Sequence, residues 1–191
     1  MSDAGFESVL LVPVPAAEAA VAEHRVRLDS SARDGVPAHL TVLYPFLPPA
    51  GIGPGVLAEL SGLFAGVPRF SFTLDRVRWF GESVVWLGPA DESPFRKLTG
   101  LAAAAYPSCQ PYGGVYEDVV PHLTIGHVPG GPLDGPAELR GPAELRAAAD
   151  AIRPLLPIKA EATAVTLMAG PPPGRPGPPG QWRTVASFPL G

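Results

Sequence analysis

Cysteine, lysine and charged residues in general are scarce in this chain of 191 residues. Cys109 is the single cysteine, which excludes a disulfide within the chain and a zinc site built on cysteines. Lysine occurs only at Lys97 and Lys159, and charged residues make up 17% of the chain. With a formal net charge of −4 and a pI near 5.5, the protein as a whole does not attract a phosphate backbone. Any nucleic-acid substrate therefore has to be small or held locally.

Long hydrophobic runs are also lacking. The apolar run within SVLLVPV (8–14) spans about six residues, and no basic segment precedes it. It predicts a buried strand, not a signal peptide or a membrane span, so we expect a cytoplasmic protein without a membrane partner. Pro (26) and Gly (22) are abundant, but hydrophobic residues reach 46% and mean hydropathy is +0.18. This balance favours one folded domain with proline and glycine in its loops.

Short strands and helical segments alternate along the chain, and the series runs twice. ESVVWLGP (82–89) repeats the beginning of ESVLLVPV (7–14). The pattern predicts strands at 8–14, 39–46, 70–80, 82–89, around His122, at 158–170 and at 181–190, and helices at 16–29, 55–66, 92–106 and around 137–155. The sequence therefore predicts an α+β fold of two β-α-β-α-β halves related by a pseudo-twofold. They cover about 7–81 and 82–170 of a single domain (1–191) that the strand at 181–190 closes.

The last strand of each half changes phase midway. Apolar residues alternate on one face up to Leu74 and on the other face from Val77. The same change separates Ala162 from Val165. A β-bulge produces such a slip because it inserts one residue into the strand. We therefore expect a bulge in both strands.

Two segments have low complexity. GPAELRGPAELR (135–146) is a direct duplication that leads into a helix and indicates no function by itself. GPPPGRPGPPG (170–180) lacks most of the N–H donors of a strand, so it is expected to be a loop between the last two strands, with Arg175 near its tip.

Two of the four histidines stand in the same tripeptide, His-Leu-Thr. The first copy, His39 to Thr41, lies in VPAHLTVLYPF, and the second, His122 to Thr124, lies in VVPHLTIGHV. Residues i and i+2 of a strand face the same side, so the His and Thr of each copy project together. A pseudo-twofold relation between the halves would bring both pairs to one central cleft.

Two imidazoles and two hydroxyls in one cleft suit attack at phosphorus. A neutral imidazole can take the proton of the attacking water or hydroxyl, while an imidazolium protonates the leaving oxygen. An ordinary histidine pKa of about 6.5 allows both forms near neutrality. The threonine hydroxyls can donate to the phosphate oxygens. No metal is expected. A histidine metal site is a weaker alternative, because no carboxylate ligand stands at a useful spacing.

The paired motifs resemble those of the two-histidine phosphoesterase superfamily, in particular its branch of 2′-5′ RNA ligases and cyclic nucleotide phosphodiesterases. The resemblance covers essentially the whole chain. It implies a bilobal α+β fold with antiparallel sheets around a central cleft, and catalysis by His39, Thr41, His122 and Thr124. It also implies activity on 2′,3′-cyclic or 2′-5′ phosphodiesters, with no cofactor.

Members of this superfamily often carry an aromatic residue five positions after the first motif histidine and a basic residue five positions after the second. In this chain these positions are Tyr44 and His127. Tyr44 suits packing against a base or ribose, whereas His127 replaces the usual arginine. Both have the opposite strand parity to the motif pairs, so they reach the cleft only through a bulge or twist. Core packing of Tyr44 and an incidental strand position for His127 are the alternatives.

The expected function is a metal-independent phosphodiesterase that acts as a monomer on nucleotides or short RNA, with 2′-5′ ligation as the reverse reaction. The alternative is a non-catalytic module that binds nucleotides or RNA ends on the same fold. Two complete acid–base pairs favour the enzyme, because a binding module does not need both imidazoles and both hydroxyls. Which histidine is the base, and which direction matters in the cell, are open at this point.

Overall fold

The structure is a computed structural model that describes residues 5–116, 118–128, 141–172 and 181–191. The order strand, helix, strand, helix, strand occurs twice, which confirms the α+β prediction. The first copy consists of β1 (Glu7–Pro13), α1 (Pro15–Leu28), the short α2 (Ser30–Arg33), β2 (His39–Leu43), α3 (Pro54–Ala65) and β3 (Phe70–Phe80). The second consists of β4 (Val84–Pro89), α4 (Ser93–Ala105), β5 (Leu123–His127), α5 (Pro142–Ile152) and β6 (Ile158–Ala162), followed by β7 (Ala164–Gly170) and β8 (Arg183–Pro189).

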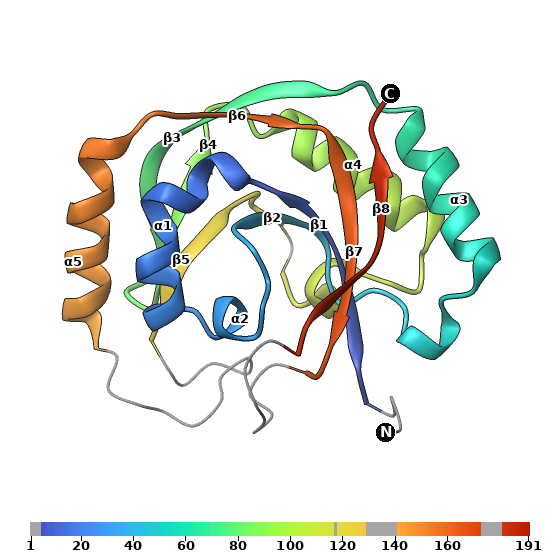
Figure 1. Cartoon of the computed structure of the whole chain (residues 1–191), viewed down its shortest axis with the longest axis horizontal. Helices are drawn as coiled ribbons and strands as arrows, with labels where there is room; N and C mark the ends of the chain where they lie inside the picture. Colours follow the sequence, from blue (N-terminus) through green and yellow to red (C-terminus); the bar gives the residue numbers. More distant parts are fainter. Residues whose placement is uncertain (1–4, 117, 129–140, 173–180) are drawn as a thin grey trace.

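The strands form two antiparallel sheets of four, in the orders β2-β1-β7-β8 and β5-β4-β3-β6. The halves share these sheets, because β3 of the first half lies between β4 and β6. The two His-Leu-Thr copies lie at β2 and β5, and each of these is an edge strand of its sheet. These two strands contact each other near the middle of the molecule (Figure 1). The fold therefore places the two motifs where the edges of the sheets meet.

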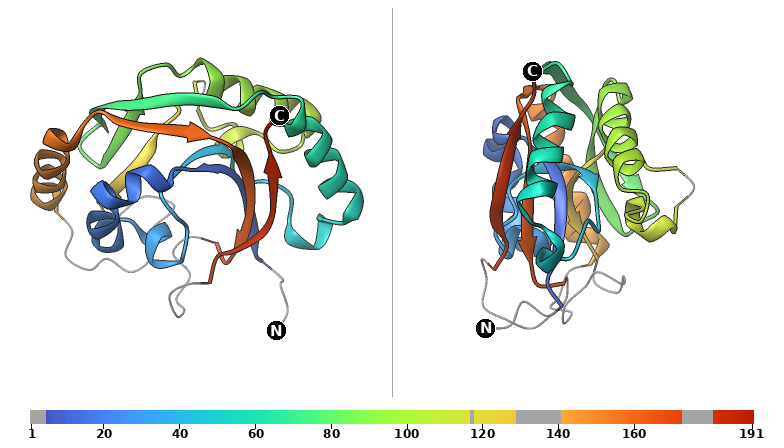
Figure 2. Two further views of the ribbon diagram at one scale, coloured as in Figure 1. Left: turned by 45° about the horizontal axis from the view of Figure 1, so that its top comes forward. Right: turned by 90° about the vertical axis from the view of Figure 1, so that its right-hand side faces the viewer.

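The helices cross between the halves. Helix α1 packs against β5, and α4 packs against β2, so each motif strand is supported by the helix of the other half (Figure 2). Pro15 and the alanines of its first turns favour helix formation in α1. Its buried side chains are Ala17, Val21, Leu28 and, unexpectedly, Arg25. None of the helices in the described part of the chain has the length and apolarity needed to cross a bilayer.

The main hydrophobic core lies between the sheets and the helices and includes side chains from both sheets. A second, smaller cluster covers the other face of the first sheet and consists of Val9, Leu11, Val36, Met168 and Trp182, with Tyr44 packed against it. The ring of Trp182 occupies the place that a Cβ at Gly170 would need. This cluster gives the first sheet a second buried apolar layer on the side away from the main core.

The expected phase changes both occur, but in different forms. In β3 the pairing with β4 shifts between Leu74 and Arg76, as a bulge requires. The predicted single strand at 158–170 is instead divided at Thr163: β6 pairs with β3, and β7 continues in the other sheet beside β1. The second prediction of a bulge is therefore wrong. The change of phase there marks a change of sheet.

Some predicted boundaries also differ from the structure. The first motif strand ends at Leu43 and not at residue 46, because Pro45 has no N–H to continue the ladder. Helix α5 ends at Ile152, and a 3₁₀ turn follows over Arg153–Leu155. Residues 135–140 of the duplication and residues 173–180 of the expected loop, with Arg175, lie outside the described residues.

Candidate active site

The motif side chains of each half share one face of their sheet. Thr41 pairs with Leu11, so it projects on the same side as Leu11 and the small apolar cluster. Thr124 pairs with Trp86 in the second sheet, and His122 directly precedes β5. We call the side of each sheet that carries these His and Thr residues the histidine face. The four side chains are partly exposed.

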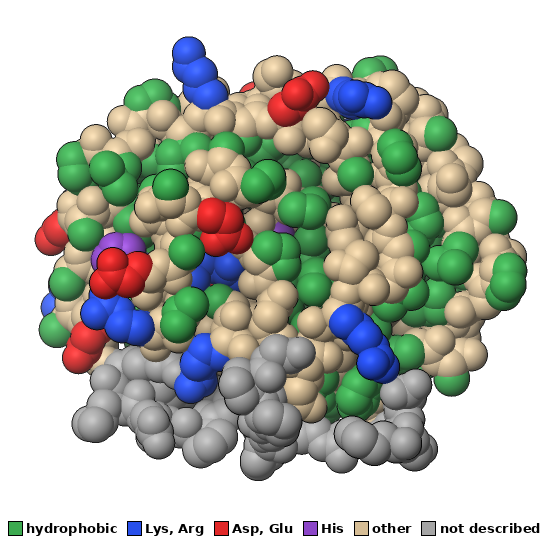
Figure 3. Space-filling model, viewed as in Figure 1, with side chains coloured by type: hydrophobic (Ala, Val, Ile, Leu, Met, Phe, Trp, Pro, Cys, Tyr) green, Lys and Arg blue, Asp and Glu red, His purple; other side chains and the backbone are tan. Residues whose placement is uncertain are grey.

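The two imidazoles lie within electrostatic reach of each other. A positive charge on His122 is one of the causes that lower the pKa of His39. This agrees with the contact between β2 and β5. In the space-filling view of this side of the molecule, a histidine is just visible near the centre, among hydrophobic and neutral side chains (Figure 3). The structure thus brings together the two motifs that the sequence singled out.

Both imidazole rings are held in the same way. Nδ1 of His39 lies 2.7 Å from the carbonyl oxygen of Pro37, and Nδ1 of His122 lies 2.7 Å from that of Val120. A carbonyl oxygen can only accept, so in each ring Nδ1 carries the hydrogen and donates it. In the neutral ring Nε2 is then left with its lone pair. Each motif therefore presents a base at Nε2, and on protonation the same atom becomes an acid.

The surroundings of both rings favour the neutral form. Burial is the largest cause that lowers the pKa of His39, to about 4, and the charge of Arg25 adds to it. The hydrogen bond to Pro37 and the charge of Asp29 act in the opposite direction. Burial also lowers the pKa of His122, against the hydrogen bond to Val120. The two rings thus differ in one respect: the charge of Arg25 disfavours the protonated form of His39, whereas burial is what lowers the pKa of His122.

Two aromatic rings enclose His122. Phe80 and Trp86 stack with their centroids 4.8 Å apart. The ring of His122 meets Phe80 edge to face at 5.0 Å and lies 5.7 Å from Trp86. Gly88 leaves room for Trp86, because a Cβ there would lie 3.1 Å from the indole ring. These ring contacts restrict the imidazole in addition to its hydrogen bond.

The sequence interpretation missed this aromatic pair, although a signal was present. When ESVVWLGP is aligned with ESVLLVPV, Trp86 falls opposite Leu11. In the structure Leu11 pairs with Thr41, and Trp86 pairs with Thr124. The internal repeat thus predicts that Trp86 lies beside the second motif.

Two further bulges act on the residues that follow the motifs. Val42 is an extra residue in the pairing of β2 with β1, and Ile125 is an extra residue in the pairing of β5 with β4. Each bulge inverts the parity of the residues after it. Tyr44 therefore packs on the small apolar cluster, and His127 pairs with Val84, on the side of Trp86. Tyr44 and His127 therefore both reach the histidine face because a bulge precedes them.

Tyr44 is partly buried there and its hydroxyl is engaged. The phenol donates a hydrogen bond to Oε2 of Glu7 at 2.5 Å. Burial, together with this bond, raises the pKa of Tyr44. The tyrosine therefore combines core packing with a place on the histidine face, so the two interpretations of Tyr44 are not exclusive. His127 is half-buried at the equivalent position of the second sheet.

Tyr112 is a third residue that the sequence did not reveal. It lies in the connection between α4 and β5 with a left-handed φ of 51°. Its N–H donates to the carbonyl oxygen of Tyr44 at 2.6 Å. Burial raises the pKa of its phenol, and hydrogen bonding with Thr41 opposes this. Within PYGGVY no periodic pattern marks this tyrosine, because its position depends on a loop conformation.

A pocket of about 530 Å³ lies beside the site. None of the motif side chains lines it, so it does not hold the reaction centre. The lining of the pocket consists of Pro45, Phe46, Leu47 and Pro48 after β2, and Pro107, Ser108, Cys109, Gln110 and Gly113 before β5.

Among the described residues, no three His, Cys, Asp or Glu side chains lie together as a metal site would need.

Comparison with known proteins agrees with this architecture. The profile of the 2′-5′ RNA ligase superfamily matches residues 12–170. TT0787 of Thermus thermophilus is similar with a TM-score of 0.61 at 19% identity, covering 96% of this chain and 97% of that chain. Escherichia coli LigT complexed with 3′-AMP is similar with a TM-score of 0.57 at 20% identity, covering 96% and 97%. LigT complexed with NADP⁺ has a TM-score of 0.56 at 19% identity, covering 97% and 98%. No curated protein sequence matches the chain.

Proposed function

The chain belongs to the 2′-5′ RNA ligase superfamily, and from this membership and its site we propose that it is a phosphodiesterase of small nucleotides or short RNA. The proposed reaction opens 2′,3′-cyclic phosphates or cleaves 2′-5′ phosphodiester bonds. The observation that carries the proposal is the matched pair of imidazoles. Each has its Nδ1–H bound to the carbonyl two residues upstream, which leaves Nε2 of both rings for proton transfer.

For a 2′,3′-cyclic phosphate the proposed step is an in-line displacement. A water oxygen attacks phosphorus and gives its proton to Nε2 of His39. The bond from phosphorus to one ribose oxygen breaks, and that oxygen takes the proton from Nε2 of a protonated His122. Thr41 and Thr124 donate to the non-bridging oxygens, where negative charge grows. The product is a phosphomonoester. When an RNA hydroxyl attacks in place of water, the same step forms a 2′-5′ bond, and the reverse of that step, with the roles of the two histidines exchanged, cleaves it.

The charges around the rings support this division of roles. Arg25 acts with burial to disfavour the protonated form of His39, and a neutral ring is what a base requires. Burial also lowers the pKa of His122, which favours its neutral form in the free protein. A bound phosphate anion would favour the charged form of His122, which makes it an acid when substrate is present.

The composition of the histidine face supports a small ligand. The protein is acidic overall, so long-range attraction for RNA is absent. Tyr44 and Phe80 are partly exposed and pack on the apolar cluster and on Trp86, respectively, so their rings are available to a base or ribose. The structures of the similar LigT contain 3′-AMP and NADP⁺, which supports a nucleotide ligand for this chain as well.

The proposal is tested with a panel of 2′,3′-cyclic nucleotides and 2′-5′ dinucleotides, assayed in excess EDTA. Turnover of at least one compound should survive chelation and be lost in His39→Ala and in His122→Ala. His24→Ala is the matched control, because His24 belongs to neither motif. Binding of these compounds without turnover would instead establish the non-catalytic alternative. Turnover that needs an added divalent ion would contradict the metal-independent mechanism.

A further inference from the structure

Arg25 is an exception on the buried side of α1. Its side chain is 2% exposed, although the neighbouring inward residues Val21 and Leu28 are apolar. A buried guanidinium is costly unless it is paired and hydrogen-bonded. Arg25 meets this condition through an ion pair with Asp29 at 2.8 Å. Packing alone does not explain an arginine at this core position, because an apolar residue would fill it with a smaller desolvation penalty.

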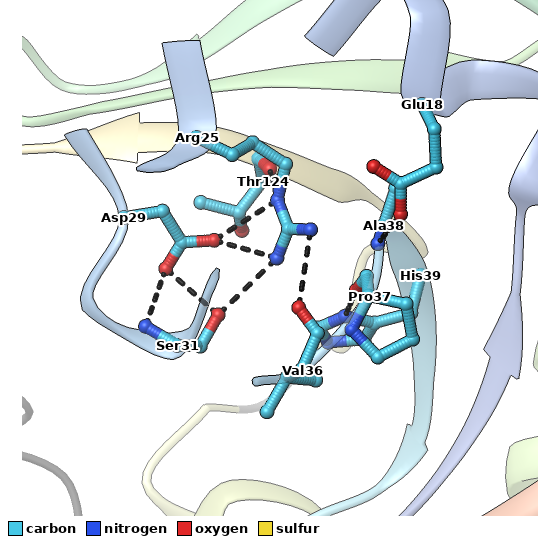
Figure 4. A network of polar contacts seen from close by, with 9 residues as sticks. All are labelled: Glu18, Arg25, Asp29, Ser31, Val36, Pro37, Ala38, His39 and Thr124. Atoms are coloured by element: carbon cyan, nitrogen blue, oxygen red, sulfur yellow. Dashed lines mark hydrogen bonds and ion pairs between the residues drawn. The ribbon is translucent and has the colours of Figure 1, made fainter. Parts of the chain in front are cut away.

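The guanidinium donates hydrogen bonds to two side chains and to two backbone carbonyl oxygens (Figure 4). Nε and Nη2 donate to Oδ2 of Asp29 at 3.1 and 2.8 Å, and Nη2 also donates to Oγ of Ser31 at 3.3 Å. Nη1 donates to the carbonyl oxygen of Val36 at 3.3 Å. Nε donates in addition to the carbonyl oxygen of Thr124 at 3.1 Å. The last two acceptors are backbone atoms from opposite halves of the protein.

Both backbone acceptors belong to the motif segments. Val36 directly precedes Pro37, whose carbonyl accepts the Nδ1 hydrogen of His39. Thr124 is itself a motif residue. The same helix also binds the first segment through Glu18, whose Oε1 accepts the N–H of Ala38 at 2.7 Å. Helix α1 thus connects the approach to the first histidine with the backbone of the second motif.

We propose that Arg25 is a positioning residue that fixes the two His-Leu-Thr motifs relative to each other. This inference rests on the proposed function for its catalytic consequence, but its structural part stands on the contacts above. The two motifs lie on edge strands of different sheets, so no backbone ladder joins them. The hydrogen bonds from one guanidinium to Val36 and Thr124 span this gap.

Only arginine can make this set of contacts. Its planar fork carries five N–H donors, whereas lysine has one ammonium at a single point. Asp29 is held in turn by the N–H and the hydroxyl of Ser31 at 3.0 and 2.8 Å, so the fork is oriented from both sides. A lysine could keep the ion pair, but it could not reach Val36 and Thr124 at once.

The same arginine also acts on the charge of His39. The charged groups that face this ring are Arg25 and Asp29 at the end of α1, and His122 from the second half. Arg25 lowers the pKa of His39 and Asp29 raises it, with Arg25 the larger of the two effects. Removal of both side chain charges should therefore raise the pKa of His39. A purely structural role of the ion pair would lower stability without this change.

The test uses two variants of the full chain. Arg25→Lys keeps the charge but loses the fork. Arg25→Met combined with Asp29→Asn removes both charges, while the asparagine introduced at position 29 can still cap α2 at Ser31. Arg27→Lys is the matched control on the same helix, because Arg27 is 62% exposed. Folding is checked by circular dichroism, kcat and KM are measured on the best cyclic nucleotide, and the histidine nitrogens are titrated by NMR.

Arg25→Lys should lose about 10–100-fold in kcat, since a misplacement of about 1 Å can cost 10²-fold, and KM should change less than about threefold. The double variant should lose a similar factor, and its His39 should titrate at higher pH than in the wild type. Arg27→Lys should resemble the wild type in every measurement. Because the NMR titration needs no turnover, it also decides the inference if the protein cleaves none of the compounds.

Folded variants that keep kcat within twofold of the wild type would overturn the proposal. So would an unchanged His39 titration in the folded double variant. If Arg25→Lys does not fold, the double variant, which leaves no unpaired buried charge, carries the test with the same criteria.

Discussion

The pH dependence of kcat/KM tests the proposed roles of the two histidines most directly. In the proposed step His39 acts as the neutral base and His122 as the protonated acid. The rate should therefore rise with pH through the pKa of His39 and fall through the pKa of His122. An exposed pair would place both limbs near the ordinary value of about 6.5. The structure moves the two limbs away from that value.

The expected positions follow from the surroundings of each ring. Burial and the charge of Arg25 lower the pKa of His39 to about 4, so the acid limb of kcat/KM should lie at about pH 4. Burial also lowers the pKa of His122, so the basic limb should lie below pH 6.5. The profile of kcat reports the enzyme with bound substrate. Its basic limb should lie at higher pH than that of kcat/KM, because the phosphate anion favours the protonated His122.

The assay is the initial rate on one cyclic nucleotide from pH 3.5 to 9, for the wild type and both single variants. His39→Ala and His122→Ala should each lose about 10²–10⁴-fold in kcat. The double variant should lose little more, because the two groups act in one step. His39→Ala should lack the acid limb, and His122→Ala the basic limb. A wild-type acid limb near pH 6.5, or a folded His122→Ala protein that keeps the full bell, would refute this reasoning.

Three more predictions concern stability and the positions around the motifs. Lowering the pH from 7 to 5 should reduce the free energy of unfolding by about 2 kcal/mol through His39 alone. The pKa of this histidine is about 6.5 in the unfolded chain and about 4 in the folded protein, so the unfolded state binds more protons between these values. Urea denaturation at the two pH values measures this, and His39→Gln should remove the contribution of His39 from the difference. Tyr112→Phe removes the phenol beside Thr41 and should lower kcat about 2–10-fold, the value of one hydrogen bond, whereas Tyr116→Phe should have no effect. Gly126→Ala should destabilise the protein by about 1–3 kcal/mol in thermal unfolding, because a Cβ there would collide with the side chain of Leu28, and an unchanged Tm would contradict this packing.

Much of the fold could be predicted because the spacing of apolar residues along the chain indicates where strands and helices lie. The strand at Phe70–Phe80 was expected with both its boundaries, and its change of phase is the register shift after Leu74. The separation of β6 from β7 at Thr163 could not be predicted in this way. A bulge and a change of sheet give the same slip of parity in the sequence. Only the pairing partners, β3 on one side and β1 on the other, distinguish them.

In the candidate site too, some residue positions follow from local periodicity and others depend on the pairing between strands. Each His-x-Thr pair shares a strand face by a period of two, so its placement follows from sequence. Tyr44 and His127 have the wrong parity by that rule, and they reach the histidine face only because Val42 and Ile125 are inserted as bulges. Val42 is an apolar strand residue like Leu40 and Leu43, so nothing in its chemistry marks it as an extra residue. Register of this kind is fixed by pairing across strands, which one strand alone does not reveal.

Arg25 adds something that the repeat itself cannot supply. Two halves related by a pseudo-twofold present two equivalent imidazoles, each with the same hydrogen bond at Nδ1. General acid–base catalysis requires one of them neutral and the other protonated, so the equivalence has to be broken. Helix α1 packs against β5 just as α4 packs against β2, but the last two turns of α4, LTGLAAAA (98–105), contain no charged residue. The cation near the end of α1 therefore has no counterpart in the corresponding turns of α4. It disfavours the charged form of His39, so in the proposed step the side chain that binds both motif segments would also distinguish the base from the acid.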